Sequence, residues 1–178
     1  MRSIDISKLE LDWIFSETET DRHFPSAVKL LTARKLTVAT AESCTGGLIG
    51  KMFTDVSGVS AVFVGGMITY TNRVKMRGLG VSAETIAEHS EVSAECACEM
   101  AECARAFFES NIGISATGFA GPSGGNERDE VGTVYLGISI AADTVVYRLC
   151  FGQLSRDEIR TRTAIFAAKE LVNMLKKG

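Results

Sequence analysis

The sequence predicts a three-layer α/β/α sandwich built on a mixed, mostly parallel sheet. Two observations predict this class. Short β-rich runs alternate with stretches of helical periodicity through the early part of the chain, and two more β-rich runs follow one another near its end. Alternation is typical of parallel strands joined by right-handed helical crossovers, whereas consecutive strands form an antiparallel hairpin. The chain has 178 residues, which suits one compact domain.

The early elements follow in order. Residues 25–35 (PSAVKLLTARK) space their apolar side chains as a helix does, with Pro25 at a position suited to the first turn. Residues 36–41 (LTVATA) and 62–71 (VFVGGMITYT) predict strands, and helical periodicity returns between them from residue 45. Short helices are expected at 72–80 and 82–90.

The later elements complete the sheet. Residues 92–110 predict the longest helix, in which Ser93 precedes an acidic first turn. A strand at 111–118 and a glycine-rich loop at 119–130 come next. The strands expected at 132–141 and 144–151 are joined by Ala-Ala-Asp, which indicates a hairpin, and residues 155–177 predict the closing helix.

The first residues differ in character from the rest. Residues 16–23 (SETETDRH) are polar and acidic, so we expect an N-terminal extension or a short packed helix over 1–24 and one domain over 25–178. The first fifteen residues alternate charged and apolar side chains and lack the continuous apolar core of a secretory signal. We therefore expect a cytoplasmic protein.

Composition narrows the classes of partner. Hydrophobic residues make up 46% and charged residues 23% of the chain, which indicates a folded core. No apolar run reaches the roughly 18 to 20 residues that a membrane span needs. The net charge is −3, and Lys and Arg form no stripe that could follow a phosphate backbone. We therefore expect neither a nucleic acid nor a membrane as partner.

The cysteines predict thiols rather than disulfides or a metal site. Their number is five, which is odd, and no export signal accompanies them. Cys96, Cys98 and Cys103 fall in one helical stretch, where residues two apart point to different faces and cannot chelate one ion well. Since the chain has only two histidines, we expect packed helix thiols and no metal.

A dense polar cluster, Ser43-Cys44-Thr45-Gly46-Gly47, lies where a strand passes into a helix. The first N–H groups of that helix favour an anion or a developing oxyanion, and the glycines allow close approach to the backbone. In the alternative, Ser or Thr simply caps the helix and the glycines permit the turn. The spacing alone weights the two interpretations equally.

A reactive serine requires a base. Nothing in the sequence couples His23 or His89 to Ser43, and a buried lysine is the other side chain that serves a serine in this way. Tyr70 and Lys75 follow the second strand and would face the same crevice as Ser43 if the two strands are neighbours. From the residues alone, a solvated lysine and a strand aromatic are the simpler interpretation.

Two further clusters could bind a ligand. Residues 117–125 (TGFAGPSGG) leave a strand as Ser43 does, and should open on the same edge of the sheet. They match neither a Walker phosphate loop nor a dinucleotide-binding loop. Arg156 and Arg160 lie one turn apart in the closing helix and suit a phosphate or carboxylate, although such residues are more often a solvated face.

Four motifs in order resemble the CinA C-terminal domain family, also called the PncC or nicotinamide-mononucleotide deamidase family. They are AESCTGG, ITYTN with Lys75 five residues after Tyr70, ATGFAGPSGG and VGTVYLGI, and the resemblance extends over about residues 25–176. Larger CinA proteins carry an additional N-terminal domain that resembles molybdopterin-binding domains. This chain is too short to hold one, so we expect the stand-alone form.

The resemblance implies deamidation of nicotinamide mononucleotide to nicotinate mononucleotide and ammonia, without cofactor or metal. It implies Ser43 as nucleophile, Lys75 as base and Tyr70 as an assisting group, in a homo-oligomer such as a dimer or tetramer. The substrate would be held by Thr45, Gly46, Gly47, Thr117, Gly118, Gly121, Arg156 and Arg160.

The sequence departs from the family pattern near the closing helix. FGQLSR has one residue more than the family's F-x-G-D-R and lacks its aspartate, Ser123 stands where many members carry Asp, and Glu91 replaces a small residue. None of these departures touches Ser43, Tyr70 or Lys75, so we expect activity to survive. Two alternatives to the deamidase stay open at this point: a non-catalytic nucleotide-binding or regulatory protein, and a hydrolase of another small amide or ester.

Overall fold

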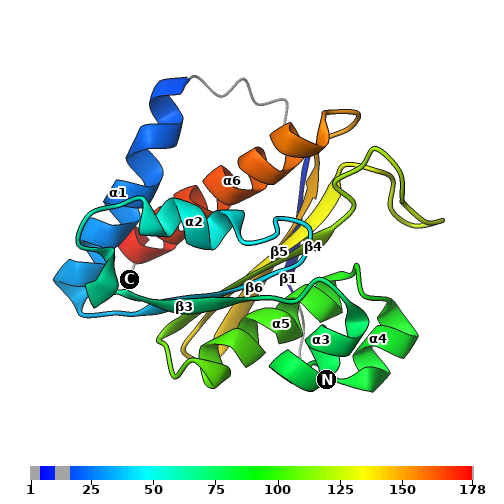
Figure 1. Cartoon of the computed structure of the whole chain (residues 1–178), viewed down its shortest axis with the longest axis horizontal. Coiled ribbons are helices and arrows are strands. Elements are labelled where there is room, and N and C mark those ends of the chain that lie inside the picture. Colours follow the sequence, from blue (N-terminus) through cyan, green and yellow to red (C-terminus); the bar gives the residue numbers. More distant parts are fainter. Residues whose placement is uncertain (1–4, 11–16, 178) are drawn as a thin grey trace.

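A six-stranded mixed sheet forms the centre of the computed structural model, which describes residues 5–10 and 17–177 (Figure 1). The strands lie in the order β1-β6-β5-β4-β2-β3. Strands β4, β2 and β3 are parallel to one another, β1 is parallel to β6, and β5 is antiparallel to both its neighbours. Their bounds are Asp5–Glu10, Val38–Glu42, Phe63–Ile68, Ile112–Gly118, Thr133–Ile140 and Asp143–Cys150 for β1 to β6.

Helices cover both faces of the sheet, which confirms the three-layer α/β/α prediction (Figure 1). One face carries α1 (Glu17–Arg34), α2 (Leu48–Thr54) and α6 (Arg156–Lys177), and α1 and α2 pack on α6. The other carries α3 (Asn72–Val74), α4 (Ala83–His89) and α5 (Ala94–Phe107), of which α5 packs on β2, β4, β5 and β6. A 3-10 turn, η1 (Val59–Ala61), and a π-helical turn, η2 (Lys75–Leu79), complete the elements.

The main core lies between the sheet and α1, α2 and α6. Leu31, Phe53 and Phe166 are almost fully buried there against strand residues such as Ile114 and Leu136. On the opposite face, Gly113 allows α5 to lie directly on β4, because a Cβ atom at this position would collide with the carbonyl oxygen of Ala101. The sheet is therefore held rigidly between two tightly packed helical layers.

Two helices differ from the sequence-based expectation. Pro25 does not lie in a first turn, because α1 begins at Glu17 and runs through it. Pro25 is exposed on the outer face of α1, while Phe24 and Ala27 are buried on its inner face. The longest helix is α6, with 22 residues, not α5, with 14. Helix α5 stops early because Glu109 adopts a left-handed φ of 50°.

Residues 5–10, inside the predicted N-terminal extension, pair with β6 as the edge strand β1. The rest of the extension before Glu17 lies outside the described residues. The predicted hairpin of β5 and β6 is confirmed, and Ala141 supplies a positive φ of 54° in its turn. No helix among the described residues is long and apolar enough to span a bilayer.

The parallel part of the sheet determines where functional side chains can gather. Strands β2, β3 and β4 end together, since Glu42 pairs with Ile68 on one side and with Ala116 on the other. The segments that follow all three strands therefore leave from one edge, which confirms the expectation for Ser43 and the loop after residue 117.

Candidate active site

Ser43 is fixed by a tight turn that follows β2 directly. Its N–H donates to the carbonyl oxygen of Ala116 on the neighbouring strand at 2.8 Å, and its own carbonyl accepts from the N–H of Gly46 at 3.1 Å. Gly46 and Gly47 then adopt left-handed φ angles of 61° and 94° and lead into α2. These conformations explain why glycines occupy both positions.

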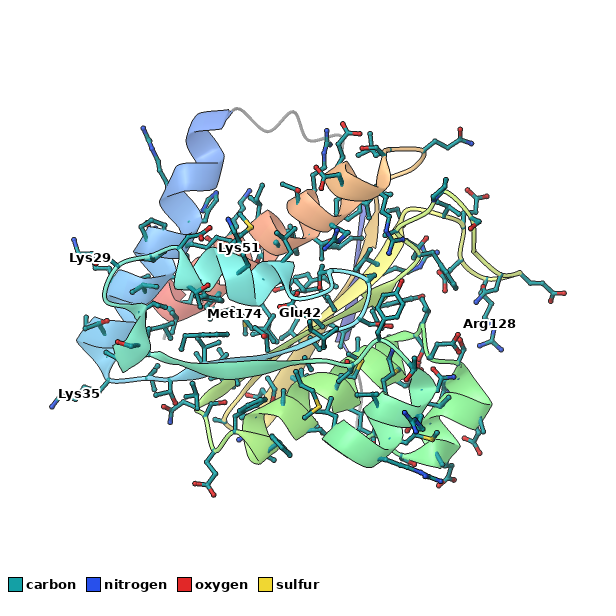
Figure 2. The ribbon with its side chains drawn as sticks, in the orientation of Figure 1. Lys29, Lys35, Glu42, Lys51, Arg128 and Met174 are labelled. Carbon is teal, nitrogen blue, oxygen red and sulfur yellow. The ribbon has the colours of Figure 1, made fainter. Side chains whose placement is uncertain are left out.

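A buried carboxylate caps the helix that starts here. Glu42 is 1% exposed and lies beneath α2 (Figure 2). Its Oε2 accepts from the N–H groups of Gly47 and Ile49 at 3.0 Å each, and its Oε1 accepts from that of Gly50 at 2.8 Å. The negative charge thus meets the positive end of the helix, and the start of α2 is fixed relative to β2.

This cap changes the expectation that the first N–H groups of the helix after Ser43 would bind an oxyanion. The N–H of Gly46 is bonded to Ser43 and that of Gly47 to Glu42. The N–H groups of Gly46 and Gly47 therefore serve the fold and are not available to an oxyanion.

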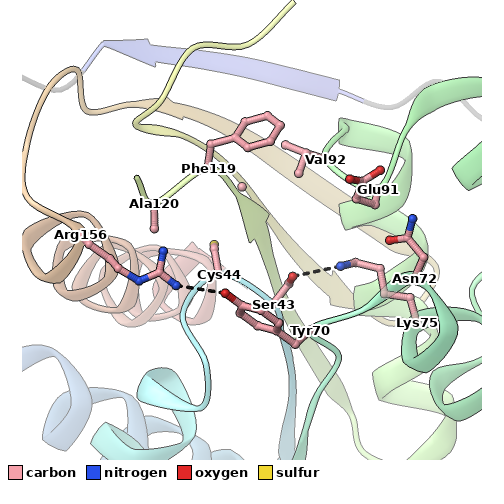
Figure 3. Close-up of a pocket in the computed structure, with 11 residues that line it drawn as sticks. Ser43, Cys44, Tyr70, Asn72, Lys75, Glu91, Val92, Phe119, Ala120 and Arg156 are labelled. Atoms are coloured by element: carbon pink, nitrogen blue, oxygen red, sulfur yellow. Dashed lines mark hydrogen bonds between the residues drawn. The ribbon is translucent and has the colours of Figure 1, made fainter. Parts of the chain in front are cut away.

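Lys75 points at Ser43 from the first residue of η2. Its Nζ lies 3.0 Å from Ser43 Oγ and 3.1 Å from the carbonyl oxygen of Thr69, and the side chain is 1% exposed (Figure 3). The two residues are 32 positions apart in the sequence and meet because β2 and β3 are neighbours.

Burial lowers the pKa of Lys75 below its ordinary value of 10.5, since an ammonium ion loses its hydration there. Cys96 and Cys44, in their thiolate forms, and Glu91 oppose this lowering of the pKa with smaller effects. A lysine with a lowered pKa is neutral in a larger fraction of molecules near pH 7, and a neutral amine can accept the hydroxyl proton of the serine beside it.

Cys44 lies beside Ser43 and is also buried. Burial raises the pKa of its thiol to about 12, against a smaller opposing effect of Lys75. The reactive form of cysteine is the thiolate. Cys44 is therefore a neutral wall residue at neutral pH, and Ser43 is the nucleophilic side chain that the geometry favours.

A pocket opens over this pair at the edge of the sheet (Figure 3). It is lined by Ser43, Cys44, Tyr70, Asn72, Lys75, Glu91, Val92, Gly118, Phe119, Ala120 and Arg156. Of the predicted site residues, the structure thus brings together Ser43, Tyr70, Lys75, Gly118 and Arg156.

Arg156 and Tyr70 form one wall of the pocket. Arg156 donates from Nη1 to the carbonyl oxygen of Gly121 at 2.9 Å and from Nη2 to the hydroxyl of Tyr70 at 3.2 Å. The arginine thereby joins α6 to the glycine-rich loop and to the segment after β3. Its guanidinium group is the positive charge at this end of the pocket.

The other predicted residues support the pocket from outside. Arg160 donates from Nε and Nη2 to the carbonyl oxygen of Thr45 at 3.2 and 2.8 Å, so it holds the turn. Thr117 donates from Oγ1 to the carbonyl oxygen of Glu91 at 2.7 Å. Gly121 contributes its carbonyl to Arg156, and Gly46 and Gly47 form the turn.

Six residues that line the pocket were not among the predicted site residues: Cys44, Asn72, Glu91, Val92, Phe119 and Ala120. Asn72 was visible as the last residue of ITYTN, and Phe119 and Ala120 as part of the glycine-rich motif. Val92 carried no signal, because it belongs to a turn whose position only the packing of α5 determines.

Comparisons with known proteins agree on one family. The model of the CinA C-terminal domain matches residues 22–175. A protein of Caldanaerobacter subterraneus subsp. tengcongensis named "putative competence-damage inducible protein" is 49% identical over 140 residues, which are 79% of this chain and 34% of that protein. A protein of the same name from Clostridioides difficile is 43% identical over 94% of this chain and 38% of its own length. The chain spans about a third of the length of these relatives.

Solved structures share the fold closely. The competence/damage inducible protein CihA of Agrobacterium tumefaciens has a TM-score of 0.85 at 34% identity, over 91% of this chain and 98% of that one. The competence-damaged protein (CinA) superfamily protein of Escherichia coli has a TM-score of 0.86 at 26% identity, over 91% and 94%.

The cap at α2 gives a test of the site's scaffold. In Glu42→Gln, an amide NH2 would face backbone N–H donors, and the charge on the helix end would be lost. We expect the free energy of unfolding to fall by about 1–3 kcal/mol, measured by urea denaturation. Glu84→Gln, an exposed side chain in the first turn of α4, is the matched control and should change it by less than about 0.5 kcal/mol. Equal effects in both variants would contradict the role of Glu42.

Proposed function

Because the chain belongs to the CinA C-terminal domain family, we propose that it is an amidohydrolase that converts nicotinamide mononucleotide into nicotinate mononucleotide and ammonia. The observation that carries this proposal is the 3.0 Å contact between Lys75 Nζ and Ser43 Oγ in a pocket that also holds a guanidinium group. A serine paired with a buried lysine suits acyl transfer, and the cation suits a phosphorylated substrate.

The first half of the reaction forms an acyl-enzyme. Neutral Lys75 accepts the proton of Ser43 as Oγ attacks the carboxamide carbon, and the carbonyl becomes an oxyanion. The protonated lysine then donates its proton to the amide nitrogen. The C–N bond breaks, ammonia leaves, and the nicotinoyl group remains as an ester on Ser43.

The second half reverses these roles with water. Lys75, neutral again, accepts a proton from a water molecule, which attacks the ester carbon. The bond to Oγ breaks, and Ser43 takes back the proton from Lys75. The nicotinic acid group that forms keeps the second proton of the water and loses it to solvent, so the product leaves as a carboxylate. The proton that Ser43 gives up and regains passes through Lys75 in both halves, because its Nζ lies beside the reacting oxygen.

Tyr70 and Arg156 complete the proposed machinery. The Tyr70 hydroxyl accepts a hydrogen bond from Arg156 and retains its own proton, which it can donate to the developing oxyanion. Arg156 uses one donor on Gly121 and one on Tyr70. The remaining donors of its guanidinium fork are assigned to the substrate phosphate.

Ammonia release from nicotinamide mononucleotide tests the reaction directly. We expect turnover by the wild type and a loss of about 10³-fold or more in Ser43→Ala and in Lys75→Met, because each removes one member of a unit that acts together. Ser60→Ala and Lys51→Met, both exposed positions, are the matched controls. A folded wild type that releases no ammonia would overturn the substrate, and an active Ser43→Ala would overturn the nucleophile.

Arg156→Ala tests how the phosphate is bound. We expect KM for nicotinamide mononucleotide to rise about 10- to 100-fold, the range for one charge-assisted contact, with little change for the unphosphorylated nicotinamide riboside. Arg128→Ala is the control, since Arg128 extends away from the body of the molecule (Figure 2). Equal losses for both substrates in Arg156→Ala would assign the arginine to the scaffold instead.

A further inference from the structure

The pocket contains a carboxylate that the proposed reaction has not used. Glu91 lines it on the side of Lys75 and Asn72, and Arg156 stands at the other end with Ser43 between them (Figure 3). Among the eleven lining residues, Glu91 is the only acid. A ligand bound over Ser43 would therefore lie between a cation at one end and an anion at the other.

The chain holds Glu91 in place by several independent contacts. Its carbonyl accepts from Thr117 Oγ1 at 2.7 Å, and its Oε2 accepts from Ser90 Oγ at 3.3 Å. Ser90 itself adopts a left-handed φ of 80°, and its carbonyl accepts from Ser93 Oγ at 2.9 Å. A non-glycine residue in this conformation costs about 1 kcal/mol or more, so the surrounding contacts determine the turn that presents Glu91.

The thiols near Lys75 do not share this charge. Burial raises the pKa values of Cys44 and Cys96 to about 12, so both are neutral at neutral pH. Among the residues that line the pocket, Glu91 is therefore the negative group that acts on the lysine side of Ser43. A carboxylate has about four acceptor positions, and the hydrogen bond from Ser90 occupies one of them.

We propose that Glu91 is a specificity-determining residue that selects substrates whose leaving group becomes cationic, namely amides, and that disfavours the carboxylate product. This inference rests on the proposed function, because Lys75 must protonate the leaving group. The leaving nitrogen stands on the lysine side of Ser43, and it becomes an –NH3⁺ group once Lys75 has given it a proton. Glu91 attracts that charge and accepts its N–H donors before the C–N bond breaks.

The negative charge of Glu91 disfavours two other species, the carboxylate product and an ester whose leaving group becomes an anion. The product carries a carboxylate where the substrate carried a neutral amide, and Glu91 repels it, which speeds its departure. An ester with a phenolate leaving group develops negative charge on the leaving oxygen, and Glu91 opposes this also. Removing the charge of Glu91 should therefore change the rates of amide and ester cleavage in opposite directions.

The test compares Glu91→Gln with Glu88→Gln. Both remove one charge, but Glu88 is exposed, lies three positions earlier in α4 and does not line the pocket. Ammonia release from nicotinamide mononucleotide is measured with and without added nicotinate mononucleotide. Phenolate release from p-nitrophenyl acetate is measured against a Ser43→Ala blank, and thermal unfolding checks the fold of each variant.

We expect Glu91→Gln to lower kcat for the amide about tenfold, to strengthen inhibition by the product about tenfold, and to raise Ser43-dependent ester cleavage. Glu88→Gln should behave as the wild type. If Glu91→Gln matches Glu88→Gln on amide and ester alike, the role of Glu91 is overturned while the deamidase stands.

A wild type without ammonia release would overturn the proposed function alone. The ester would then decide the role of Glu91, since its cleavage needs only Ser43 and Lys75. Faster ester cleavage in Glu91→Gln would support the charge selection, and equal rates would overturn it.

Discussion

The burial of the Lys75 amine against Ser43 is the constraint on which the rest of the site depends. An ammonium ion in this position loses most of its hydration and receives in return one hydroxyl and one backbone carbonyl. The structure thereby disfavours the charged form of the lysine. The same loss of hydration that makes this group costly for folding increases the fraction of Lys75 that is neutral and able to act as a base, a trade between stability and activity that is general at functional sites.

The scaffold around this pair has to be rigid, because a neutral amine can act as a base only at hydrogen-bonding distance. Three unrelated contacts provide that rigidity. Glu42 fixes α2 to the end of β2, Arg160 holds the Thr45 carbonyl from α6, and Ala116 binds the Ser43 N–H from β4. The turn that carries Ser43 is thus tied to two strands and two helices.

Much of the fold was predictable from the sequence because its signals are local. The alternation of strands and helices, the N-terminus of α5 at Ser93 and the β5–β6 hairpin all follow from periodicity and turn chemistry. Edge strand β1 was missed, since its six residues (DISKLE) carry only two apolar side chains and fall in the predicted N-terminal extension. Its pairing with β6 is a contact between distant segments, which no local pattern records.

The site was predictable in a different way. The residues alone did not decide whether Ser43 and Lys75 have a chemical role, and only the family resemblance predicted that they act as a pair. In the structure, Lys75 Nζ lies 3.0 Å from Ser43 Oγ. Arg160 and Thr117 were expected at the ligand, yet each bonds a backbone carbonyl behind the pocket wall. Arg156 and Arg160 are one turn apart in the sequence, and only the position of α6 against the Ser43 turn separates their roles. Glu91 stood out in the sequence as a departure from the family pattern. Its position near Lys75 could not be predicted, because it depends on how α5 packs on the sheet.

The central claim is that Lys75 activates Ser43 as a neutral base. The most direct measurement is the rate at which phenylmethanesulfonyl fluoride modifies Ser43 as a function of pH, with the modified residue identified by peptide mass. The rate should be low where Lys75 is protonated, rise with pH as it loses its proton, and level off with a midpoint below 10.5, the ordinary value for lysine. In Lys75→Met the modification should be slow at every pH. A midpoint at 10.5 or above, or equal rates in Lys75→Met and the wild type, would contradict the account.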